Sequence, residues 1–138
     1  LQTLLIVPIL ILVIGLVFDL GAVAVAQVQA QTAVDLAVQD AAKYINWSTF
    51  YVTQEIVLLD EALAVAAHRV AQYGAGHVEV LQLTVIPYAI DDRHYQGIYL
   101  VGQVEIPMRY LHLIGLSHID RRVQALAVPA YGIAGAGN

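Results

Sequence analysis

The chain opens with an apolar segment too long and too uniform for a small soluble domain to bury. Leu4–Phe18 contains no polar side chain, and after Asp19 the apolar character continues from Leu20 to Ala26. As a helix, residues 4–26 would measure about 35 Å, enough to cross a bilayer core of about 30 Å. The basic n-region and cleavage site of a secretory signal are not visible here. We interpret the start at Leu1 as a processed end from which a basic leader has been removed.

The helical pattern continues well beyond the apolar segment. After Gly21 no further Gly or Pro occurs up to Asn46, and alanines are frequent. Polar residues recur every four positions, which places them on one helix face: Gln27, Gln31, Asp35, Gln39 and Lys43. The opposite side carries Ala30, Ala33, Ala37, Ala41 and Tyr44. We therefore predict one helix over residues 1–46, about 70 Å long, whose outer half packs against something outside the bilayer.

Three residues interrupt the apolar part of this helix. Pro8 removes a backbone hydrogen bond, which either kinks the helix or lets it adapt between bilayer and assembly; Gly15 is the second interruption. Asp19 is an acid in apolar surroundings, where a partner or an interface is expected. Either it contacts a neighbouring subunit, through that subunit's Leu1 amine or a freed backbone amide, or it marks the membrane–water boundary.

The remainder of the chain predicts a second helix and a small sheet. Apolar residues recur at three or four positions from Phe50 to Tyr73, with Ser48 as N-cap and Gly74-Ala75-Gly76 as the end. The period then changes to two, which predicts strands at His77–Ile86, Ile98–Met108 and Arg121–Pro129, with a bulge or two-sided burial in the first. Asp91-Asp92 falls in a turn, and the tail Tyr131–Asn138 is expected to be flexible or tucked into a neighbour. The fold class is α+β, with a helical domain at residues 1–46 and a globular domain at 47–138.

Composition excludes several classes of function. Apolar residues make up 59% of the chain and charged residues 12%, whereas soluble domains average about 25% charged. Eleven acids against six bases give a net charge of −5, so a basic footprint for nucleic acid is missing. Without cysteine, disulfides and thiol chemistry are also excluded.

Residues suited to catalysis or metal binding do not form a recognisable set. No tight ligand spacing connects His68, His77, His94, His112 and His118, and Asp91-Asp92 lacks the alternating oxygens of a calcium loop. Arg121-Arg122 is expected to be a surface pair or an intersubunit salt bridge. Neither a nucleophile motif nor a P-loop occurs, so we expect no enzyme, no metal and no cofactor. Asn46-Trp47-Ser48 fits the glycosylation sequon, although a plain helix break explains it as well.

The order of these elements resembles a known family. The run from Gln2-Thr3-Leu4 to Phe18-Asp19-Leu20-Gly21, continued by Gln31–Ala37, resembles the N-terminal region of TadE/TadG-like pseudopilins, in the tight-adherence branch of the type IV pilus superfamily. Val101–Pro107, His112–Leu116 and Val123–Ala127 are similar to that family's closing strands.

The resemblance implies cleavage by a prepilin peptidase just before Leu1 and assembly from the membrane into a helical filament driven by a cytoplasmic ATPase. Type IV pilins usually carry a glutamate at the position that Leu5 occupies here, where it neutralises a neighbour's N-terminal amine. The partner of the Leu1 amine is therefore open.

We expect a structural subunit of an extracellular Tad-like filament, serving adhesion or surface attachment, that polymerises with copies of itself and lies in the membrane before assembly. Its assembly residues would be Leu1, Leu5, Pro8, Gly15, Asp19 and Gly21. Small residues on such a helix allow backbones to approach closely. One alternative is a minor pseudopilin that primes or caps a pilus. Another is a single-span, membrane-anchored binding module that does not polymerise.

Overall fold

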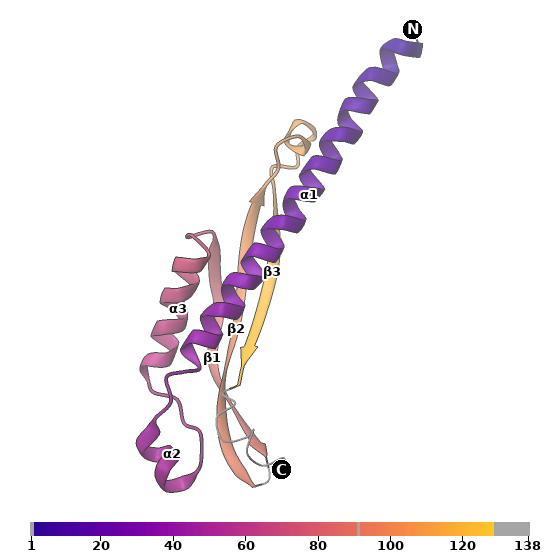
Figure 1. The fold of residues 1–138 in the computed structure, drawn as a ribbon. Helices are drawn as coiled ribbons and strands as arrows, with labels where there is room; N and C mark the ends of the chain where they lie inside the picture. Colours follow the sequence, from indigo (N-terminus) through magenta and orange to yellow (C-terminus); the bar gives the residue numbers. More distant parts are fainter. Residues whose placement is uncertain (1, 91, 129–138) are drawn as a thin grey trace.

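A computed structural model describes residues 2–90 and 92–128 of the chain. The elements in order are α1 (Gln2–Ala41), α2 (Trp47–Thr53), α3 (Glu61–Tyr73), β1 (Val78–Ile90), β2 (Arg93–Pro107), η1 (Leu111–Ile114) and β3 (His118–Ala127). Figure 1 shows α1 lying along the sheet with its C-terminal half and extending past every other element with its N-terminal half. The predicted α+β class, with a long helix and a small antiparallel sheet, is confirmed.

The first helix ends five residues earlier than predicted. It closes at Ala41, and the chain then leaves the helical path because its backbone pairs with a distant segment. Ile45 forms a bridge with Leu58, and the Asn46 amide donates to the Val57 carbonyl at 2.7 Å. Such pairing is a tertiary effect, which overrides a favourable local helix propensity.

The single second helix predicted at 50–73 is wrong, because the chain forms two helices there. Gln54 caps α2 in the left-handed region with φ 62°, and the segment up to Asp60 is extended before α3 begins. The N-cap of α2 is Asn46, whose side-chain oxygen accepts from the Thr49 amide at 3.3 Å, and not Ser48. The predicted helix end at Gly74 is confirmed.

The sheet is an antiparallel meander in the order β1-β2-β3. All three predicted strands exist, and the first two are longer than predicted because the hairpin continues to Ile90 and Arg93. The predicted bulge is confirmed by a register shift between Val80 and Gln82. Asp92 lies in the hairpin turn with φ 64°, whereas Asp91, Pro129 and the predicted tail fall outside the described residues.

The core lies between the C-terminal half of α1 and one face of the sheet. Small buried residues of α1 allow close packing: Ala30, Ala33, Val34, Ala37, Val38 and Ala41. Ala62, Ala66 and Val70, spaced four apart on α3, are buried as well, and α3 packs on α1 and β1. Since residues 30–41 share one core with the sheet, the C-terminal half of α1 is structurally part of the globular unit. The domain division at 46/47 stays a prediction.

Candidate functional site

The N-terminal half of α1 is an exposed apolar surface. Large apolar side chains are exposed along it: Leu4, Leu5, Ile6, Val7, Ile9, Leu10, Ile11, Leu12, Val13, Ile14, Leu16, Val17, Phe18 and Leu20. By length and composition, α1 could cross a membrane. An exposed apolar surface of this size marks a contact with a membrane or another chain. We call residues 4–20 the apolar half of α1.

Two of the residues singled out in the sequence lie within this surface without interrupting the helix. Pro8 is inside α1, which is continuous from Gln2 to Ala41. Leu5 is exposed, as expected of an apolar contact residue. Leu1 lies outside the described residues.

Asp19 is the buried polar residue of the apolar half. Its carboxylate is 2% exposed and accepts three backbone hydrogen bonds, from the amides of Arg109 at 3.2 Å, Tyr110 at 3.0 Å and Leu111 at 2.7 Å. Hydrogen bonds to an ionised acceptor are stronger than those between neutral groups. In the monomer, the Asp19 carboxylate is therefore bound by three backbone amides of its own chain, and its position relative to a membrane boundary stays a prediction.

The same loop contacts α1 one helical turn earlier, at Gly15. A Cβ atom at Gly15 would lie 2.7 Å from the Tyr110 Cβ, so the close approach requires glycine. The Phe18 and Tyr110 rings are 6.0 Å apart and tilted by 34°. Gly15 and Asp19, four residues apart, thus share a helix face that holds the β2–β3 loop. We call this set of contacts, made by Gly15, Phe18 and Asp19 with residues 109–111, the loop latch.

Gly21 faces a different side of α1 and remains open. No atom lies within 4 Å of the position a Cβ would take there. Gly21 contributes to an apolar groove of about 580 Å³, lined by Val17, Phe18, Gly21, Ala22, Val25, Ala26 and Gln29. Grooves with small residues are where neighbouring helices approach closely in membranes.

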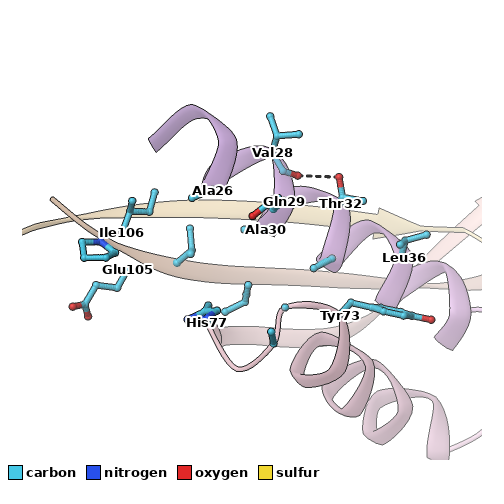
Figure 2. A pocket seen from close by; sticks show the side chains of 16 residues that line it. Ala26, Val28, Gln29, Ala30, Thr32, Leu36, Tyr73, His77, Glu105 and Ile106 are labelled. Carbon is cyan, nitrogen blue, oxygen red and sulfur yellow. Dashed lines mark hydrogen bonds between the residues drawn. The ribbon is translucent and has the colours of Figure 1, made fainter. Parts of the chain in front are cut away.

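A second groove of about 570 Å³ lies between α1, the turn after α3, and β2 (Figure 2). Ala26, Ala30 and Ala33 form its α1 side, while Tyr73, His77 and Ile106 approach from the other elements. Thr32 does not offer its hydroxyl to this groove, since it donates to the Val28 carbonyl at 2.9 Å. The lining is mostly apolar, which suits packing more than polar catalysis.

A polar cluster joins the C-terminal end of α1 to α3. Asp40 accepts from the Tyr73 hydroxyl at 2.6 Å and pairs with Lys43 at 3.2 Å and Arg69 at 3.6 Å. The hydrogen bond from Tyr73 and that from Lys43 lower the pKa of Asp40, and the same Asp40 carboxylate raises the pKa of Tyr73. This cluster was not predicted from the sequence, because an i to i+33 pairing leaves no periodic signal.

The other polar residues considered in the sequence do not come together in one site within the described residues. Arg121 and Arg122 are exposed on β3, opposite Val104 and Gln103 of β2. Among residues 2–90 and 92–128, no three histidine or acidic side chains are grouped as metal ligands. The Asn46 side chain is used as the α2 cap, and its glycosylation stays a prediction. Arg109, Tyr110 and Leu111, which contact Asp19 and Gly15, are residues of the loop latch that sequence reasoning missed.

Comparison with known proteins returned one family. Residues 3–43, less than a third of the chain, match the model described as "Putative Flp pilus-assembly TadE/G-like". Neither curated proteins nor solved structures gave a match. The matched segment is α1 with the turn that follows it, so it includes Gly15, Asp19 and Gly21. The similarity of the closing strands to this family stays a prediction.

Proposed function

We propose that this chain, whose residues 3–43 are similar to a Flp pilus-assembly TadE/G-like family, is a structural subunit that polymerises through α1 into an extracellular filament. Before assembly, the apolar half of α1 would hold the subunit in the membrane. After assembly, the same surface would be covered by α1 helices of neighbouring copies. The globular part would form the outer wall.

The observation that carries the proposal is the exposed apolar half of α1. It is joined to a globular part, made of the C-terminal half of α1 with α3 and the sheet, that already has its own core. Burial of apolar surface contributes roughly 25 cal/mol per Å². The side chains of Leu5, Leu10 and Phe18 are 63%, 56% and 63% exposed in the monomer, so more than half of their surface is available for burial by a bilayer or by neighbours.

Assembly would depend on apolar packing instead of a charge pair within the span. The first acidic residue is Asp19, and its carboxylate is already bonded to three amides of its own chain. With Leu5 apolar, a neighbour's amine finds no carboxylate in the first turns of α1. A filament would require this contact between copies to be heterologous and to repeat without closing into a ring.

The subunit would reach this state through the partners that the family resemblance implies: a prepilin peptidase, the pilus assembly machinery and the membrane. It would act as a non-catalytic structural protein, with adhesion or surface attachment as its use.

The groove at Gly21 offers a specific test. Gly21→Leu places a side chain in the groove at a position where a Cβ meets nothing within 4 Å, so the monomer should fold and reach the membrane normally. If neighbours pack there, filament yield in sheared material, counted by electron microscopy, should fall at least tenfold. Ala67→Leu, an exposed helix position on α3, is the matched control and should assemble normally. Normal filament yield from Gly21→Leu would remove this face of α1 from the interface.

A further inference from the structure

The loop between β2 and β3 carries an apolar tip that the fold leaves uncovered. Within residues 110–116, which we call the loop tip, Leu113 is 84% exposed, Ile114 62% and Tyr110 48%, and Leu116 is exposed as well. Leu111, by contrast, is buried, and its amide donates to the Asp19 carboxylate of α1. The tip therefore has one side fixed to the protein and another side, rich in leucine and isoleucine, facing outward.

The loop latch sets the position of this tip along α1. Asp19 and Gly15 hold Tyr110 beside the apolar half of the helix. Figure 1 shows the loop rising beyond the ends of the strands, on the same side and in the same direction as the N-terminal half of α1. The apolar half of α1 and the loop tip thus both carry exposed apolar side chains, and they lie at the same end of the globular part.

The depth of the tip follows from the helix rise. From Gln2 to Asp19, α1 extends about 26 Å, close to the roughly 30 Å of a bilayer core. Asp19 would then lie near the boundary of the apolar layer on the side of the globular part. A tip that points from Asp19 toward the N-terminus would enter that layer.

We propose that the loop tip is a second membrane contact, inserted before assembly into the leaflet nearest the globular part. This proposal rests on the membrane-inserted state of α1 in the proposed function.

Charge favours a lipid surface as the occupant. Although the chain has a net charge of −5, Arg109 is the charged side chain within residues 106–119 and no acidic residue occurs there. An arginine beside an inserted apolar tip reaches the anionic headgroups, and tyrosine is favoured at the same depth. A protein neighbour in the filament could cover the same side chains, and the experiment below distinguishes it.

The test uses the full chain with Trp47→Phe, so that one introduced tryptophan reports its surroundings. Leu113→Trp probes the tip, Leu10→Trp probes the apolar half of α1, and Leu126→Trp is the control, an exposed leucine (59%) on β3. Each variant is placed in phosphatidylcholine–phosphatidylglycerol vesicles, with and without lipids brominated near the headgroup end of the acyl chains. We expect Leu113→Trp to show blue-shifted emission and at least twice the bromine quenching of Leu126→Trp.

The outcomes separate the two proposals. If Leu10→Trp is quenched while Leu113→Trp behaves like Leu126→Trp, the tip is outside the membrane and this inference fails, although the span of α1 stands. Blue-shifted emission from Leu113→Trp without quenching would mean that protein covers the tip, which also overturns it. If Leu10→Trp is not quenched, membrane insertion of α1 itself fails.

Discussion

Asp19 and Leu111 are 92 positions apart in the sequence, yet the Leu111 amide donates to the Asp19 carboxylate at 2.7 Å. This bond and its two neighbours attach the β2–β3 loop to the apolar half of α1. The acid in the apolar helix thus orients the loop within one subunit. A polar group in such surroundings is tolerated because its hydrogen bonds are satisfied.

Removing the carboxylate should release the loop. In Asp19→Ala three amides lose their acceptor, which should lower the free energy of unfolding by about 2 kcal/mol after partial relaxation. Trypsin cleavage after Arg109, measured in detergent micelles, should become faster, whereas cleavage at Arg69 on α3 should not change. Filament yield should fall while the subunit still reaches the membrane.

Asp19→Asn is the matched control for charge, because it keeps one acceptor oxygen. It should give an intermediate cleavage rate at Arg109. Equal cleavage of the wild type and Asp19→Ala at Arg109 would contradict the latch, and unchanged filament yield would show that assembly does not need it.

The two glycines of α1 should respond in opposite directions to the same change. Gly15→Ala places a methyl group 2.7 Å from the Tyr110 Cβ, and overpacking of this kind costs about 1–3 kcal/mol. Gly21→Ala meets no atom and should gain up to about 1 kcal/mol of helix propensity. Thermal unfolding of the detergent-solubilised monomer should therefore give a lower Tm for the first and an unchanged or higher Tm for the second. A higher Tm for Gly15→Ala would mean that the loop does not approach α1 as described.

The Asp40–Tyr73 bond should make the α1–α3 contact sensitive to pH at both extremes. The pKa of Asp40 is lowered from 3.8, so its contribution is present above about pH 4 and is lost as the pH falls through the lowered value. The pKa of Tyr73 is raised from 10.0, so its contribution is present below pH 10 and is lost as the pH rises through the raised value.

Tyr73→Phe removes the hydrogen bond and keeps the ring. A plot of Tm against pH should become flatter at both ends for Tyr73→Phe than for the wild type. Tyr51→Phe, an exposed tyrosine on α2, should follow the wild type. Identical curves for all three proteins would exclude a role for this bond in stability.

The sequence predicted those elements whose signal lies in neighbouring residues, such as side-chain alternation or a glycine at a helix end. The phase slip around Leu81 indicated the bulge that separates Val80 from Gln82, because side-chain alternation is read directly from the chain. The glycine after Tyr73 likewise marked the end of α3. The long apolar run and its alanine-rich continuation predicted α1, although the predicted helix extended five residues beyond its end at Ala41.

Features created by distant contacts could not be predicted in this way. The break between α2 and α3 depends on Ile56 and Leu58, which leave the helical pattern to bridge Tyr95 and Ile45. The partners of Asp19 are backbone amides, which every residue except proline possesses, so the sequence carries no signal for them. Asp19 itself was identifiable because an acid is costly in an apolar helix.

Cryo-electron microscopy of material sheared from cells tests the central claim most directly. The account predicts long uniform fibres built mainly of this chain, with the apolar half of α1 buried at the centre and the Asp19–Leu111 bond kept within each subunit. Recovery of the chain only in the membrane fraction, or only in trace amounts at fibre tips, would contradict it and favour an anchored module or a minor pseudopilin.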